Sequence, residues 1–126
     1  MVHIALIEDD KNMQDIIKNC MEREIRESEK VEIDVFGEAE NFQKSLMEGK
    51  EYHIVFSDVE LGSMNGIALA KVLREKWPEI YVIFVTAYSE YAVESYELDA
   101  YQYILKEHME ERLPDILRKV LNKIER

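Results

Sequence analysis

The side chains of this protein that could do chemistry each follow directly on a run of apolar residues. Such runs predict buried strands, and the polar residues that end them are Glu8, Asp9 and Asp10, then Asp58, Thr86 and Lys106. In an open parallel sheet, ligands bind outside the carboxyl ends of the strands, so one edge would gather these carboxylates, the hydroxyl and the ammonium group. The pattern therefore predicts a single polar site built from four strand ends.

The chemistry of this predicted site follows from its crowded carboxylates, which repel one another and become neutral unless a cation lies among them. Mg²⁺ is the natural cation, because it takes oxygen ligands and keeps several waters. A softer metal has no ligand set here, since the three histidines are scattered and Cys20 is the only cysteine. Asp58 would attack a phosphorus atom and form an acyl phosphate. Mg²⁺ and Lys106 would neutralise charge, and Thr86 would donate a hydrogen bond to a phosphoryl oxygen.

The elements that must position this site alternate along the chain. Apolar runs predict strands at residues 2–7, 31–35, 53–57, 81–85 and 101–105. Apolar residues at helical spacing predict helices at about 11–27, 39–49, 67–77, 90–97 and 113–124, with Pro114 in the first turn of the last one. This alternation predicts a (βα)5 doubly wound, flavodoxin-like three-layer α/β sandwich whose parallel sheet has strand order 2-1-3-4-5.

Size and charge limit the class of function. The chain has 126 residues, enough for one domain, and we expect no output domain within it. Its formal net charge of −11 repels phosphate backbones, so we do not expect the chain itself to bind nucleic acid. The apolar start is too short for a signal peptide or a membrane span. The lone cysteine fits a reducing, cytoplasmic compartment.

At these strand ends the chain resembles a bacterial two-component response-regulator receiver domain of the CheY-like type, over essentially all of residues 1–126. The resemblance is carried by the segments Leu6-Ile7-Glu8-Asp9-Asp10, Val55-Phe56-Ser57-Asp58, Met64-Asn65-Gly66, Val85-Thr86-Ala87 and Tyr103-Ile104-Leu105-Lys106. The run from Phe84 to Ala92 is similar to receivers found ahead of LytTR-type DNA-binding domains.

The resemblance implies a phosphorylation-controlled signalling domain and not a turnover enzyme, since it would catalyse only its own phosphoryl transfer and dephosphorylation. A sensor histidine kinase would phosphorylate Asp58, with Lys106 and Thr86 as the other catalytic groups. The ligands of Mg²⁺ would be Glu8, Asp9, Asp58 and the backbone carbonyl of Glu60.

The resemblance also implies a switch. Thr86 would shift toward the phosphoryl group and Tyr103 would swing inward, which changes the surface of the fourth helix, fifth strand and fifth helix. Glu60 and Tyr88 would flank the path of the hydrolysing water and so tune dephosphorylation. DNA would be bound, and transcription regulated, only through an attached output domain. The resemblance leaves open a homodimer through the switch surface.

Two positions depart from the family pattern. Glu107 follows Lys106 where the family usually has a proline after a cis bond, and a cis bond before a non-proline residue costs about 3–4 kcal/mol, so we predict trans. Gly62 stands where the family's loop usually has proline, which predicts a looser loop. Both changes leave open a degenerate receiver that acts as a phosphorylation-independent interaction domain.

Two other classes of protein share part of this pattern. An aspartyl-phosphate phosphatase needs a second acid two residues after the nucleophile, where Glu60 stands, but also a cap that the chain lacks. A flavodoxin-type redox carrier would need a Ser-, Thr- and Gly-rich first loop in place of the acidic one. Taken alone, Asp9 and Asp10 could be helix caps. The charges of Glu29 and of the stretch from Arg118 to Arg126 were interpreted as solvated.

Overall fold

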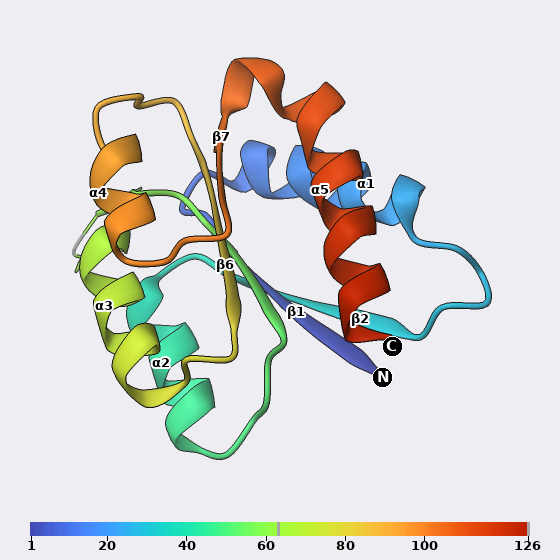
Figure 1. The fold of residues 1–126 in the computed structure, drawn as a ribbon, viewed down its shortest axis with the longest axis horizontal. Helices are drawn as coiled ribbons and strands as arrows, with labels where there is room; N and C mark the ends of the chain where they lie inside the picture. The colour runs from blue at the N-terminus through green and yellow to red at the C-terminus, as the bar shows by residue number, and fades with distance from the viewer. Residues whose placement is uncertain (63, 126) are drawn as a thin grey trace.

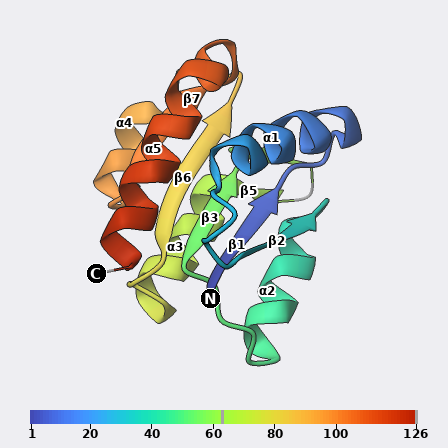
Figure 2. The ribbon, with the colours of Figure 1, turned by 90° about the vertical axis from the view of Figure 1, so that its right-hand side faces the viewer.

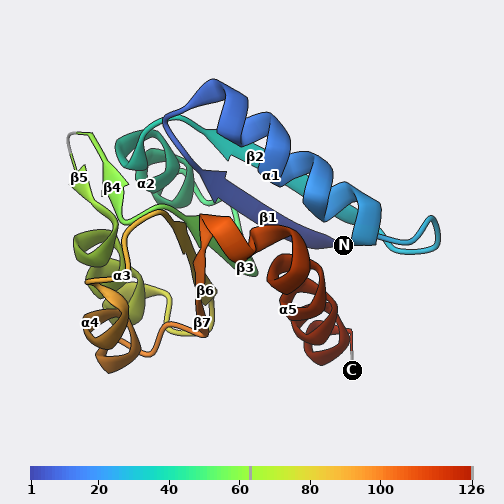
Figure 3. The ribbon, with the colours of Figure 1, turned by 90° about the horizontal axis from the view of Figure 1, so that it is seen from above.

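The protein is a single parallel sheet between two layers of helices, seen from three sides in Figures 1, 2 and 3 of a computed structural model that describes residues 1–62 and 64–125. The sheet has strand order β2-β1-β3-β6-β7. Its strands are β2 (Val31–Phe36), β1 (Val2–Ile7), β3 (Ile54–Ser57), β6 (Tyr81–Thr86) and β7 (Gln102–Leu105). All of these pairings are parallel, and the predicted strand order is confirmed.

The helices divide between the two faces of the sheet (Figure 3). One face is covered by α1 (Lys11–Glu24) and α5 (Met109–Ile124), and the other by α2 (Ala39–Met47), α3 (Gly66–Lys76) and α4 (Ala92–Glu97). Each face buries its own apolar core, since neighbouring strand residues point to opposite sides. The central strands are therefore largely apolar, and every residue of β3 is buried.

The register of the sheet brings the strand ends to one edge (Figure 2). Ile7 pairs with Ser57, Ser57 with Phe84, and Thr86 with Leu105. The residues after these strands thus leave the sheet at the same height. The predicted convergence follows from this register, because a shift of one residue would turn each side chain to the other face.

The structure differs from the sequence prediction most at the end of α1, in the loop after β3 and at the start of α5. Helix α1 ends at Glu24 and not near residue 27, and the loop after β3 contains a short antiparallel hairpin of β4 (Glu60–Leu61) and β5 (Met64–Asn65). Helix α5 begins at Met109, so Pro114 lies inside it, beyond the first turn. Burial of Met109 in the core explains the early start, because it stabilises a first helical turn that apolar periodicity did not reveal.

The backbone at Lys106 agrees with the prediction. No cis peptide bond occurs among residues 1–62 and 64–125, so the bond between Lys106 and Glu107 is trans. A 3-10 turn, η1 (Lys106–His108), joins β7 to α5 there. Among the helices of this described part, none is long and apolar enough to cross a bilayer.

Candidate functional site

The Asp58 carboxylate lies at the centre of the polar edge and is 6% exposed. Its Oδ1 accepts hydrogen bonds from the Thr86 hydroxyl at 2.7 Å and from the backbone N–H of Glu60 at 3.2 Å. Its Oδ2 accepts one from the Lys106 ammonium at 2.8 Å. Residues that are 28 and 48 positions away in the sequence therefore meet at this one carboxylate.

Lys106 also pairs with Glu8, whose Oε1 lies 2.8 Å from the ammonium nitrogen. Glu8 is 1% exposed, and burial raises its pKa against the opposing effect of Lys106. Burial alone would lower the pKa of Lys106, but its hydrogen bonds to Asp58 and Glu8 outweigh burial, so the net shift is upward. Lys106 is therefore a permanent positive charge that offsets two buried carboxylates.

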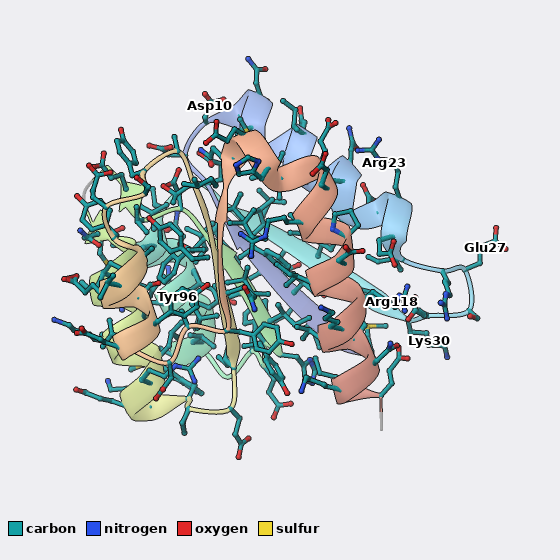
Figure 4. All side chains as sticks on the ribbon, turned by 45° about the horizontal axis from the view of Figure 1, so that its top comes forward. Asp10, Arg23, Glu27, Lys30, Tyr96 and Arg118 are labelled. Atoms are coloured by element: carbon teal, nitrogen blue, oxygen red, sulfur yellow. The ribbon has the colours of Figure 1, made fainter. Side chains whose placement is uncertain are left out.

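The two acids that follow Glu8 have different surroundings. Asp10 caps α1, because its Oδ1 accepts a hydrogen bond from the N–H of Met13 at 3.1 Å, and its own N–H donates to Glu8 at 3.1 Å. Figure 4 shows Asp10 at the edge of the molecule where β1 leads into α1. Asp9 is exposed beside it. The helix-cap interpretation thus holds for Asp10, and the structure leaves the Asp9 carboxylate facing solvent.

The hairpin after Asp58 depends on Gly66, which belongs to the Met64-Asn65-Gly66 segment. A Cβ atom at Gly66 would lie 2.3 Å from the backbone oxygen of Asp58, closer than any side chain can approach. Asn65 caps α3, since its Oδ1 accepts from the N–H of Ile67 at 2.7 Å. This segment therefore brings α3 directly against the backbone of the central aspartate.

The same hairpin orients Glu60. A ladder bond runs from the N–H of Gly66 to the oxygen of Val59 at 2.7 Å, which makes Glu60 and Asn65 a non-hydrogen-bonded pair. Among the described residues of the hairpin, 60–62 and 64–65, the ladder does not use the carbonyl oxygen of Glu60.

These groups fit a hard cation with few protein ligands. The oxygens of Glu8 and Asp58 are held by Lys106 and by further donors, and the Asp9 carboxylate beside them in the sequence is exposed. Within 1–62 and 64–125, no three His, Cys, Asp or Glu side chains are grouped closely enough to hold a metal ion by themselves. Mg²⁺ suits such a partial set, because it usually keeps waters and takes phosphate oxygens.

A second set of hydrogen bonds joins the site to Tyr103 through Tyr88. The N–H of Tyr88 donates to the Thr86 hydroxyl oxygen at 3.3 Å, and the Tyr103 hydroxyl donates to the carbonyl of Tyr88. The Tyr103 side chain is buried, which raises its pKa to about 12. The charge of the Glu60 carboxylate, which also hydrogen-bonds with the phenol, raises the pKa of Tyr88. Tyr88 thus contacts every group predicted for the switch and for dephosphorylation.

Two contacts that the sequence did not reveal hold the backbone of Tyr103 to helices at the edge of the sheet. Its N–H donates to the hydroxyl of Tyr96 on α4 at 3.2 Å, and its carbonyl accepts from Arg112 on α5 at 2.9 Å. Arg112 also contacts the side chain of Gln102 at 3.1 Å. No spacing rule links these positions, although an edge strand with unpaired backbone groups signals that something must cover them.

Fold and site together define a doubly wound α/β domain with a cluster of acidic side chains and one lysine at the carboxyl edge of its sheet. The family of the response regulator receiver domain matches residues 4–118, so the chain belongs to the response regulator receiver domain family. It is therefore a receiver domain of two-component signalling.

Relatives and solved structures agree with this assignment. The sensory transduction protein LytT of Bacillus anthracis is 34% identical over 122 residues, covering 94% of this chain and 47% of that protein. The sensory transduction protein LytR of Staphylococcus haemolyticus is 37% identical over 92 residues, covering 71% of this chain and 36% of that protein. The chain thus spans about half or less of the length of these relatives.

Among solved structures, the response regulatory domain of mrkE from Klebsiella pneumoniae has a TM-score of 0.88 and 26% identity, covering 98% of both chains. The response regulator TrrA of Thermotoga maritima, solved in complex with Mg²⁺ and BeF, has a TM-score of 0.81 and 26% identity. The match covers 95% of this chain and 99% of the TrrA chain.

Proposed function

We propose that Asp58 accepts a phosphoryl group from the phosphohistidine of a sensor kinase, in a reaction that requires Mg²⁺. The observation that carries this proposal is the Asp58 carboxylate, held between Lys106 at 2.8 Å and Thr86 at 2.7 Å. Both oxygens of Asp58 are held by donors, which is the arrangement that an acceptor of a highly charged group requires.

The proposed transfer forms one bond and breaks one. A carboxylate oxygen of Asp58 bonds to phosphorus while the P–N bond of phosphohistidine breaks, and the released imidazole nitrogen keeps the electron pair and takes up a proton. The negative charge stays on the equatorial oxygens throughout. Lys106 lies close enough to pair with one of these oxygens, and the Thr86 hydroxyl can turn from Asp58 to another.

Mg²⁺ would be held by Asp9, Asp58 and the carbonyl of Glu60, with Glu8 contributing through its hold on Lys106 and on the loop. When bound, it supplies a divalent charge that neutralises the phosphoryl oxygens. TrrA, solved with Mg²⁺ and BeF, supports this choice by similarity. Glu8, predicted as a ligand, is oriented toward Lys106, and we propose for it a role in holding that ammonium group.

The proposed output is a change in the surface formed by α4, β7 and α5. Phosphorylation would draw the Thr86 hydroxyl away from Asp58, and the hydrogen bonds through Tyr88 connect Thr86 with Tyr103. Tyr103 in turn is bonded to α4 and α5. A partner that binds this surface, including a second copy of the chain, would respond to that change.

We further propose that the domain regulates transcription through a DNA-binding segment outside residues 1–126. Its relatives include a transcriptional regulatory protein, YpdB of Escherichia coli, that is 36% identical over 66 residues, covering 52% of this chain and 27% of that protein. The net charge of −11 disfavours DNA binding by the receiver itself.

The test is intact-mass measurement after incubation with Mg²⁺ and acetyl phosphate. The wild-type protein should gain one phosphoryl group, Asp58→Asn should gain none, and the exposed carboxylate variant Asp115→Asn should behave as wild type. No mass gain with small or kinase donors would favour the phosphorylation-independent interaction domain. Continuous turnover of a phosphoester would favour the phosphatase.

A further inference from the structure

We propose that Gln14, on the first turns of α1, is a positioning residue that orients the Asp9 carboxylate for the divalent cation. This inference rests on the proposed function, because it concerns the cation of that site. Gln14 is not among the acids, the hydroxyl or the ammonium group of the site, and nothing in its residue type suggests a role there. Its contacts do.

Gln14 connects α1 to the loop of residues 8–10 by hydrogen bonds. Its side-chain Nε2 donates to the backbone carbonyl of Glu8 at 2.6 Å, and its own N–H donates to the carbonyl of Asp10 at 2.9 Å. The side chain is half-buried, and its Nε2 would be at an ordinary van der Waals distance of 3.8 Å from a Cβ atom added at Gly37. The amide thus lies between the loop after β1 and the loop after β2.

The backbone of Asp9 is constrained, because hydrogen bonds hold the residues on both sides of it. Glu8 is held through its carbonyl by Gln14 and through its N–H, which donates to Phe36 at 3.0 Å. Asp10 is fixed by capping α1 and by its N–H bond to the Glu8 carboxylate. Asp9 itself is exposed, so the direction of its carboxylate depends on a backbone that Gln14 holds.

Such a contact bears on metal affinity more than on folding. Groups that orient the ligands of a metal usually change its affinity by about 10- to 100-fold when removed. Gln14 is well suited to this place, since its amide donates a strong hydrogen bond without adding a charge that would repel the cation. A purely structural glutamine would change stability and leave the affinity of the folded protein for cations unaltered.

The experiment measures cation binding directly, by Mg²⁺ calorimetry and by electron paramagnetic resonance with Mn²⁺. Gln14→Met, which keeps the length of the side chain and removes the donor, should weaken binding at least about tenfold. Gln14→Asn, which keeps an uncharged amide donor, should retain more of the affinity than Gln14→Met. The matched control is Asn12→Met, at an exposed position in the same turn of α1.

A second comparison separates positioning from general damage. In an Asp9→Asn background, Gln14→Met should have little further effect on affinity, because Gln14 acts through Asp9. With acetyl phosphate as donor, the Mg²⁺ concentration for half-maximal labelling should rise while the maximal rate stays near wild type. Wild-type affinity in Gln14→Met, or an equal loss with and without the Asp9 carboxylate, would overturn the inference. A wild-type protein that binds neither cation would refute it together with the proposed Mg²⁺ requirement.

Discussion

Arg118 joins the end of α1 and the loop after it to α5, and replacing it with methionine should destabilise the domain without touching the site. Its guanidinium donates four hydrogen bonds, two to the Glu29 carboxylate at 2.7 and 2.9 Å, one to the Glu24 carboxylate at 3.0 Å and one to the Glu24 carbonyl at 2.8 Å. Figure 4 shows Arg118 on α5 near the loop that carries Glu27 and Lys30. The Glu29 side chain is 7% exposed and that of Arg118 16%.

The magnitude follows from the pKa of Glu29, which the hydrogen bonds from Arg118 lower from 4.5 to about 2. A shift of that size would correspond to about 3 kcal/mol if all of it were expressed in stability. Solvent at the rim of this cluster screens part of the interaction, so we expect about 2 kcal/mol for Arg118→Met. For a domain of this size, that is a fall in Tm of roughly 5–10 °C.

The sign of the pH dependence is fixed by the same shift. Because the pKa of Glu29 is lower in the folded state, its contribution to stability is present above the unfolded value of 4.5 and is lost as pH falls toward about 2. The wild-type protein should therefore lose stability between about pH 5 and pH 2 more steeply than Arg118→Met. The difference between the two proteins should be largest near neutral pH.

The assay is urea denaturation followed by circular dichroism at several pH values. Lys119→Met, at an exposed position next along α5, is the matched control and should change stability by less than about 0.5 kcal/mol. In a double-mutant cycle, Glu29→Gln should remove most of the effect of Arg118→Met. Equal pH dependence of wild type and Arg118→Met would refute the reasoning, since it would mean that the carboxylate has the same pKa with and without its partner.

Two further predictions concern the site. Gly66→Ala should destabilise the domain by more than about 2 kcal/mol and abolish labelling by acetyl phosphate, because its Cβ atom would lie 2.3 Å from the backbone oxygen of Asp58. The Tm measures the first effect and intact mass the second. A stable, fully labelled variant would contradict the packing argument. Tyr88→Phe should shorten the half-life of the phosphoprotein about fivefold, as expected from loss of the hydrogen bond between the Tyr88 phenol and Glu60. Tyr88→Ala, which removes the whole ring, should shorten it more. A half-life unchanged in both variants would exclude Tyr88 from control of hydrolysis.

The sheet could be predicted from the sequence because each of its strands carries its own signal. The run Tyr81–Thr86 is β-branched or aromatic throughout its apolar part, and the central strands are apolar on both faces, as a buried parallel sheet requires. Once order and register follow from these runs, the meeting of Asp58 with Thr86 and Lys106 follows as well. The predicted site was therefore a consequence of the fold as much as of its residue types.

The contacts that the sequence did not reveal depend on pairs distant in the chain. Arg118 and Glu29 are separated by 89 residues and were interpreted as solvated charges, yet both side chains are largely buried. Long polar side chains at the ends of helices look alike whether they face water or a partner. The hairpin after Asp58 was missed for a different reason, since strands of two residues are too short for alternation to appear.

Lys106 and Thr86 hold the Asp58 carboxylate with donors that a phosphoryl group could also use. Without a phosphoryl group, the carboxylate oxygens of Asp58 are already satisfied by Lys106, by Thr86 and by a backbone N–H. A phosphoryl oxygen can replace the carboxylate as the acceptor for the first two donors, so each hydrogen bond is exchanged and none is lost. Because an exchanged hydrogen bond costs little, the two states would differ by a small free energy. Under the proposed function, such a small difference would allow a single phosphoryl group on Asp58 to shift the population of the proposed α4, β7 and α5 surface.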